Sequence, residues 1–198
     1  MEITSKMVKD LRDKTAAGIM DCKKALGDTG GDMEKAVDLL RQKGLAVAAK
    51  RSGRATNEGV IETYIHAGGN LGVMVELGCE TDFVAKNDDF RAFARDIAMH
   101  IAALSPVAVT REEIPAEVVA REKEIYVKQA LDSGKPEAIV EKMVSGKIEK
   151  FISEICLTEQ RYVKNPDLSI QDLLNELVGK MGENISIKRF ARFQVGSE

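Results

Sequence analysis

The feature that most constrains the fold of this sequence is a point where an alternating apolar pattern gives way to a helical one. Apolar residues occupy every second position from Leu71 to Leu77, which predicts a strand with one buried face. Apolar spacings of three and four begin at Phe90 and continue to Leu104, which predicts a helix. Residues 78–90 are therefore predicted to form a strand-to-helix junction.

The pattern on either side of this junction predicts an α+β fold. Residues 60–66 are rich in β-formers and are followed by a glycine-containing turn at 68–70, so residues 59–80 are predicted to form a hairpin. Alternation returns at residues 185–195. That last segment is predicted to pair with the hairpin in a small antiparallel sheet that carries helices on one face.

The N-terminal part of the chain predicts three short helices. Thr4 or Ser5 is a candidate cap for the first helix, Asp32 is a candidate N-cap for the third, and Gly44 is predicted to end the third. Residues 48–57 are small, basic and polar, which indicates a helix tail followed by a linker.

Helical spacing also dominates the region before the last strand. Two long helices are predicted at about residues 111–131 and 137–156, separated by a tight reversal at 132–136. This arrangement is typical of an antiparallel helical hairpin. A shorter helix is predicted at about 170–181.

Composition argues against several classes of protein. The 198 residues are 44% hydrophobic, with a net charge of −3 and no basic stripe, so we expect no direct contact with nucleic acid. No apolar run approaches the 18 residues of a membrane span, and the polar N-terminus does not resemble a signal peptide. The three cysteines are isolated from one another, which favours buried thiols in a reducing cytoplasm.

A search for catalytic chemistry finds one weak candidate. Cys79 as nucleophile with His66 as base would define an enzyme, but the sequence indicates no orienting group and no oxyanion hole. A buried strand thiol is the simpler interpretation, so no enzymatic activity and no cofactor are expected. His66 and His100 lack metal-ligand spacing and are both interpreted as polar surface residues.

The acidic residues of the junction have a structural interpretation. Glu80, Asp82, Asp88 and Asp89 do not follow the spacing of an EF-hand, so no metal site is expected. Acids are favoured at a helix N-terminus, and Asp88 or Asp89 is predicted to cap the helix that follows. Phe83 has two interpretations: its spacing from Phe90 favours a core position, whereas its charged neighbours favour a side chain that stands out of the surface.

Three segments resemble one known family. Thr-Asp-Phe-Val-Ala-Lys-Asn at 81–87 is similar to the most distinctive motif of bacterial elongation factor Ts, the nucleotide-exchange factor for elongation factor Tu. Residues 11–26 and 182–190 resemble two further segments of that family, and the three occur in the family's order. The chain departs from the usual family residues at Ala16 and Ile19.

The resemblance implies an architecture. Residues 1–53 would form a ubiquitin-associated-like three-helix domain, and residues 54–198 an α+β core with a coiled-coil hairpin at about 108–157. The chain is similar to the short form of the family, with a single central unit, which implies a homodimer. Because residues 189–192 contain no cysteine, that dimer is expected to be non-covalent.

The resemblance also implies a function and a site. The chain would promote GDP release from elongation factor Tu by disturbing its Mg²⁺ and phosphate site, through Thr81, Asp82, Phe83 and Val84. Contacts with that partner are expected at six further residues: Arg12, Ile19, Met20, Lys23, His66 and His100. Met20 packed inside the helical bundle is the alternative for that residue, and an adaptor that uses the N-terminal domain alone is the alternative function.

Overall fold

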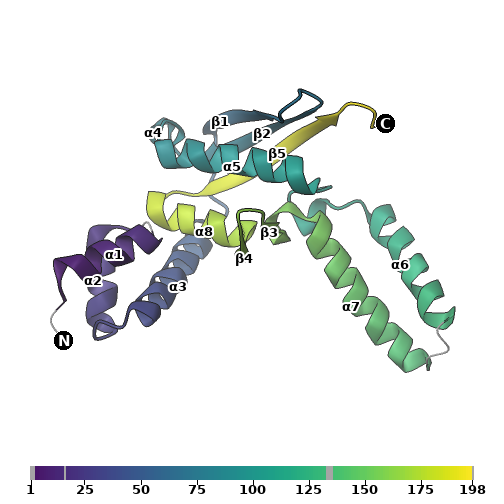
Figure 1. Ribbon diagram of the computed structural model, residues 1–198, viewed down its shortest axis with the longest axis horizontal. Helices are drawn as coiled ribbons and strands as arrows, with labels where there is room; N and C mark the ends of the chain where they lie inside the picture. The colour runs from purple at the N-terminus through teal and green to yellow at the C-terminus, as the bar shows by residue number, and fades with distance from the viewer. Residues whose placement is uncertain (1–2, 16, 133–135, 198) are drawn as a thin grey trace. The chain divides into compact units, whose positions relative to one another are not determined.

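The computed structural model describes residues 3–15, 17–132 and 136–197, so Ala16 and the centre of the predicted reversal lie outside the described residues. The predicted mixture of helices and a small sheet is confirmed (Figure 1). In chain order the elements are α1 Ser5–Thr15, α2 Ile19–Asp28, α3 Met33–Arg51, β1 Glu58–Ile65, β2 Leu71–Cys79, α4 Asp82–Ala85, α5 Asp88–Leu104, η1 Arg111–Glu113, α6 Ala116–Asp132, α7 Glu137–Ile155, η2 Leu157–Glu159, β3 Arg161–Tyr162, β4 Asn165–Ser169, α8 Ile170–Met181 and β5 Ile185–Gln194.

The chain folds into two compact units, each assembled from three segments. The first, called the motif unit here, contains Met1–Val60, Gly78–Arg91 and Asp172–Ser186. The second, called the sheet unit, contains Ile61–Leu77, Ala92–Gln171 and Ile187–Glu198. Several elements pass from one unit into the other, and the boundary that we place at residue 53 stays a prediction.

Within the motif unit, the three N-terminal helices share a small core. Leu11, Cys22 and Leu26 are fully buried at its centre, and Ala36 contributes from α3. Asp32 caps α3 as predicted, because its carboxylate accepts a hydrogen bond from the Lys35 backbone N–H at 3.1 Å.

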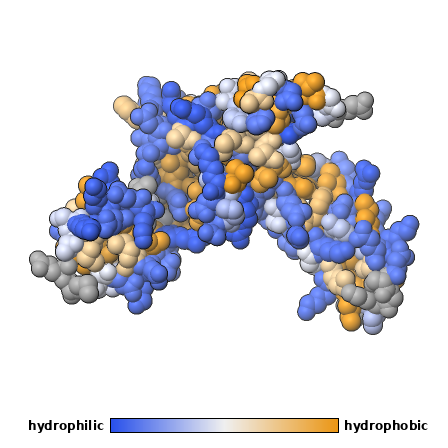
Figure 2. Space-filling view, in the orientation of Figure 1, coloured by the Kyte–Doolittle hydropathy of each residue, from blue (hydrophilic) through white to orange (hydrophobic). Residues whose placement is uncertain are grey.

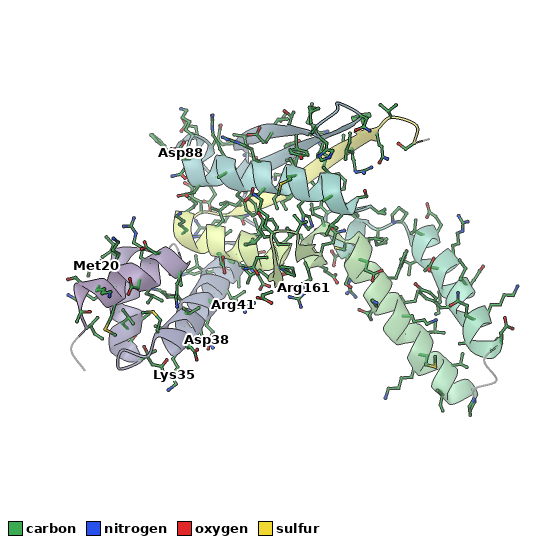
Figure 3. The ribbon with its side chains drawn as sticks, viewed as in Figure 1. Met20, Lys35, Asp38, Arg41, Asp88 and Arg161 are labelled. Carbon is green, nitrogen blue, oxygen red and sulfur yellow. The ribbon has the colours of Figure 1, made fainter. Side chains whose placement is uncertain are left out.

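The prediction that Gly44 ends α3 is wrong, since this helix continues to Arg51. Gly44 lies where α3 passes α8. A methyl group built at Gly179 would come within 3.2 Å of the Gly44 Cα, and Arg41 of α3 pairs with Asp172 of α8 at 2.7 Å. In Figure 3, Arg41 extends from α3 on the side of α8. Gly179 therefore permits the close helix crossing, because it has no side chain to meet α3, and Gly44 does not terminate α3.

The sheet has the strand order β1-β2-β5, so the last strand joins the hairpin as predicted. One face of β2 is buried through Val73, Val75 and Leu77, and Figure 1 shows α5 lying along the sheet. The buried stripe of α5 comprises Phe90, Ala94, Ile97 and Ile101.

The other face of the sheet carries exposed apolar side chains. Ile65 lies on the same face as Gly72, because a methyl group at Gly72 would meet its Cδ1 atom at 2.9 Å. Glu76, on the same face of β2 as Gly72, forms an ion pair at 2.7 Å with Arg189 of β5. Arg189 therefore lies on this face of the sheet as well. Alternation then places four exposed apolar residues on this outer sheet face: Ile61, Ile65, Met74 and Phe193.

The predicted helical hairpin corresponds to α6 and α7, which lie side by side in Figure 1. Ala130, Val140 and Val144 form one buried cluster between them, while Ile114 and Ile152 belong to a second. Arg111 of η1 connects the start of the hairpin to its end, because it donates hydrogen bonds to Glu149 of α7 and to Glu159 of η2. The short β3–β4 ladder was not predicted from the sequence.

Candidate partner-binding site

The junction between β2 and α5 contains a separate short helix, α4. The chain leaves β2 at Cys79 and enters α4 at Asp82 through the extended residue Thr81. The predicted capping of α5 by Asp88 or Asp89 is wrong, because the Asn87 side chain accepts from the Asp89 N–H at 2.9 Å. Asn87, the residue before α5, therefore supplies the capping oxygen. Asp88 lies in the first turn of α5 (Figure 3).

Phe83 is exposed, which decides between its two interpretations. Its side chain is 81% exposed, whereas its neighbours Val84 and Ala85 are buried. A continuous helix would place Phe83 on the same face as Phe90, but α4 ends at Ala85 and α5 begins at Asp88. The interruption takes Phe83 out of the buried stripe of α5, so the core position is wrong and the exposed position is confirmed.

The charge of Asp82 is balanced by Lys86, the residue that follows α4. Lys86 donates a hydrogen bond to its carboxylate at 2.6 Å. That bond is the main reason why the pKa of Asp82 lies below its ordinary value. Both side chains remain largely open to solvent, so the Asp82 carboxylate is ionised and accessible beside Phe83.

Thr81 is held by a residue that is remote in the sequence. Glu183 accepts hydrogen bonds from the Thr81 backbone N–H at 3.0 Å and from its hydroxyl at 2.7 Å. In the opposite direction, Glu80 accepts from the Asn184 backbone N–H at 2.6 Å. That bond, followed by the guanidinium of Arg54, lowers the pKa of Glu80.

Sequence reasoning identified both 81–87 and 182–190 as family segments but did not predict that they contact each other. The only signal was their joint membership of one resemblance. Glu80 was considered as a ligand of a divalent cation, yet it serves as a hydrogen-bond acceptor. Among the described residues, no group of three His, Cys, Asp or Glu side chains is arranged to hold a metal ion.

Cys79 is a structural thiol. It is buried, its Sγ donates to the Thr81 carbonyl at 3.1 Å, and burial raises its pKa to about 11. A thiol with that pKa is almost entirely protonated near neutral pH and is a poor nucleophile. The ring of His66 is exposed and bonds through Nδ1 to the Tyr64 hydroxyl at 3.0 Å. These contacts give each residue a role outside catalysis.

The interpretation of His100 as a surface residue is wrong. His100 is fully buried, and its Nε2 bonds to Gln160 at 3.0 Å while Nδ1 accepts from the Val163 N–H at 3.3 Å. Burial lowers its pKa, which favours the neutral ring that these two bonds require. Gln160 in turn donates to the Glu154 carbonyl at 2.7 Å, so the histidine closes a polar network inside the sheet unit.

The N-terminal helices expose the side chains that the resemblance singles out. Met20 is 74% exposed, so it does not pack inside the bundle, and Figure 3 shows it at the outer end of these helices. Ile19 is also exposed, as are Arg12 and Lys23. Two exposed apolar side chains in the first turn of α2, near basic residues, provide an adaptable contact surface.

The family model and the similar proteins found for this chain all carry the same name. The family model described as Elongation factor TS matches residues 1–197. The protein named Elongation factor Ts of Desulfotalea psychrophila is 79% identical over 197 residues, covering 100% of both chains. The protein of the same name from Carboxydothermus hydrogenoformans is 60% identical over 98% of this chain and 89% of its own length, and that of Syntrophobacter fumaroxidans is 59% identical over 100% and 99%.

Proposed function

This chain belongs to the elongation factor Ts family, and we propose that it releases GDP from elongation factor Tu by inserting Phe83 and Asp82 beside the bound Mg²⁺ and phosphates. The main support for this proposal is that Phe83 is largely exposed, while the backbone before it is fixed by the hydrogen bonds between Thr81 and Glu183. A large apolar side chain held out in water on a rigid support is suited to enter a partner pocket.

The mechanism requires no covalent chemistry. Displacing the Mg²⁺ leaves the phosphate charges unneutralised, so the affinity for GDP falls. By linkage, GDP and this chain then weaken each other's binding by the same factor, and GTP can rebind and displace the chain. No covalent bond is made or broken in this cycle, and we place the cycle in the cytoplasm.

Phe83 cannot supply the whole effect. Burying one phenylalanine contributes about 1.5–3 kcal/mol, which corresponds to roughly ten- to 150-fold in a rate or equilibrium constant. Further contacts must hold the complex together while Phe83 acts. We assign that docking role to Ile19 and Met20 with the basic residues Arg12 and Lys23. Contacts through His66 and His100 remain predictions, and His100 would have to leave its buried network to make one.

A titration of nucleotide release tests the two roles separately. Fluorescent GDP is released from elongation factor Tu at increasing concentrations of the chain. Phe83→Ala should lower the maximal rate about ten- to hundredfold, whereas Met20→Ala should raise the half-saturating concentration. Val107→Ala, which truncates a half-exposed apolar side chain outside both regions, is the matched control. A maximal rate for Phe83→Ala equal to that of the unaltered chain would refute the proposal.

The outer sheet face supports a second part of the proposal, a homodimer. Its four exposed apolar side chains, Phe193 among them, all lie in the sheet unit. A second copy would bury the same residues on both partners in a two-fold interface. Figure 2 shows orange, apolar side chains over the hairpin end of the sheet. Because all three cysteines are buried free thiols, the association should be non-covalent.

Sedimentation across a dilution series, with and without reductant, tests the dimer. The unaltered chain should sediment as a dimer whose stability does not depend on reductant. Phe193→Asp should shift it to monomer, whereas Val107→Asp, which changes an exposed apolar residue elsewhere in the sheet unit, should not. A monomer at micromolar concentration with full exchange activity would exclude the dimer as a requirement.

A further inference from the structure

The short helix α4 needs an external support to hold Phe83 in one place. A single helical turn is not stable by itself in water, because helix formation has a costly nucleus. Thr81 is its N-cap residue, a position at which a threonine hydroxyl ordinarily accepts a hydrogen bond from the first turn. Here the Thr81 hydroxyl donates to Glu183 instead. The support for α4 therefore comes from another segment of the motif unit.

That segment is the turn between α8 and β5. Gly182 has a φ of +69°, a left-handed conformation that glycine adopts without strain, and its N–H donates to the Val178 carbonyl at 2.9 Å. This ends α8 and directs the next residue, Glu183, toward Thr81. The two residues are 102 positions apart in the sequence.

The bonds to Glu183 fix both position and rotation. The carboxylate uses one oxygen for the Thr81 N–H and the other for the Thr81 hydroxyl. Bonds to the backbone N–H and the hydroxyl of one residue restrain its φ and its side-chain rotamer, and hydrogen bonds to a charged acceptor are stronger than neutral ones. Phe83 follows two residues later in the same turn, so its direction depends on this anchor.

A second set of contacts keeps the anchor itself in place. Glu80 accepts from the Asn184 N–H, and the Asn184 side chain donates to the Arg54 carbonyl at 2.7 Å. Lys180 of α8 pairs with Asp89 at the start of α5 at 2.6 Å. The turn that carries Glu183 is thus connected to the chain on both sides of α4.

We propose that Glu183 is the positioning residue of the exchange motif: by binding both the backbone and the hydroxyl of Thr81, it sets the direction in which Phe83 meets the partner. This inference rests on the proposed function of Phe83. Glu183 acts through Thr81 and need not touch the nucleotide or the Mg²⁺ site.

The first test separates positioning from docking in the nucleotide-release titration. Glu183→Ala should lower the maximal rate by roughly ten- to hundredfold, the loss expected when bonds to a charged acceptor are removed. The half-saturating concentration should change by less than about threefold, because Ile19 and Met20 are unaltered. Glu183→Gln should retain most of the rate, since its amide can accept from the Thr81 N–H and donate to a rotated hydroxyl. A Gln variant as slow as the Ala variant would overturn the role as a hydrogen-bond anchor.

The second test asks whether Glu183 acts through Phe83. In a chain that already carries Phe83→Ala, adding Glu183→Ala should slow exchange by less than about twofold, because residues that act as a unit are not additive. Fully additive effects would overturn the inference.

If Glu183→Ala fails to fold, the pair Thr81→Val and Thr81→Ser provides the test. The valine variant should exchange nucleotide slowly, whereas the serine variant, which keeps the hydroxyl, should have a rate close to that of the unaltered chain. Equal rates for both would overturn it.

The outcomes distinguish the two levels of the proposal. If Phe83→Ala exchanges nucleotide normally, the proposed function of the motif fails. If Phe83→Ala is slow while Glu183→Ala is as fast as the unaltered chain, the proposed function stands and only the positioning role of Glu183 is refuted.

Discussion

The crossing of α3 and α8 allows a stability prediction that can be worked out from distances. A methyl group at Gly179 would lie 3.2 Å from the Gly44 Cα. Carbon atoms in contact prefer about 3.5–4.0 Å, so the helices would have to move apart by roughly 0.3–0.8 Å. At Gly44, the added methyl would meet the Asn175 carbonyl at 3.7 Å, an ordinary contact. Gly146 in α7 has open space around such a methyl within the described part of the chain.

These distances predict that the same substitution, glycine to alanine, raises the free energy of unfolding at some positions and lowers it at another. Replacing glycine by alanine inside a helix stabilises a protein by about 0.5–1 kcal/mol through backbone entropy. Gly146→Ala and Gly44→Ala should therefore raise the free energy of unfolding by about that amount. At Gly179, overpacking against rigid backbone costs about 1–3 kcal/mol, which exceeds the gain. Gly179→Ala should lower the free energy of unfolding by about 1 kcal/mol.

Urea unfolding followed by circular dichroism measures these differences. Gly146→Ala reports the entropic gain without a neighbour, and Gly44→Ala reports it on the same pair of helices that Gly179→Ala perturbs. If Gly179→Ala stabilises the protein as much as Gly146→Ala, the overpacking expected from the 3.2 Å approach of α3 and α8 is refuted. A loss at both Gly44 and Gly179 would contradict the ordinary contact at Asn175.

Two further predictions concern titratable groups. The free energy of unfolding should fall as the pH decreases from 7 to 5. Burial lowers the pKa of His100 in the folded protein, whereas an imidazole in the unfolded chain has a pKa of about 6.5. The unfolded state therefore binds a proton that the folded state does not, and acid favours unfolding. This acid sensitivity should decrease in His100→Gln, and an unchanged pH profile in that variant would contradict the assignment. Cys79, with a pKa of about 11, and the buried Cys22 and Cys156 should resist alkylation at pH 8 in the native protein and react after denaturation, as mass spectrometry would show. Rapid labelling of native Cys79 would indicate that β2 opens near its end.

Local patterns in the sequence were sufficient for most elements of the fold. The stripes of α5 and α7, the alternation of β5 and the Asp32 cap all depend on neighbours within a few residues, and each was predicted correctly. Local rules were wrong at Gly44, because α3 continues through it to Arg51, and at Asp88 or Asp89, because the Asn87 side chain already accepts from the Asp89 N–H. The β3–β4 ladder has too few residues to show a period.

The contact between Glu183 and Thr81 could not be predicted in this way. Nothing in either segment specifies the other, and the two come together only when β2, α8 and β5 have packed. The same holds for His100, whose partners Gln160 and Val163 belong to segments about sixty residues further along the chain. Polar networks that join remote segments are the part of this structure that a single sequence leaves open.

Phe83 shows why the motif needs both local and remote determinants. Its spacing from Phe90 would bury it if the helix were continuous, and the interruption at Lys86 and Asn87 prevents this. An interrupted helix alone would leave a mobile loop, and an ordered loop must offset about 1–2 kcal/mol of backbone entropy per residue. The bonds that Thr81 donates to Glu183 offset that entropy in the free protein, before the partner binds. The apolar surface of Phe83 then remains in water, and the free energy of burying it becomes available only when a partner pocket closes around it.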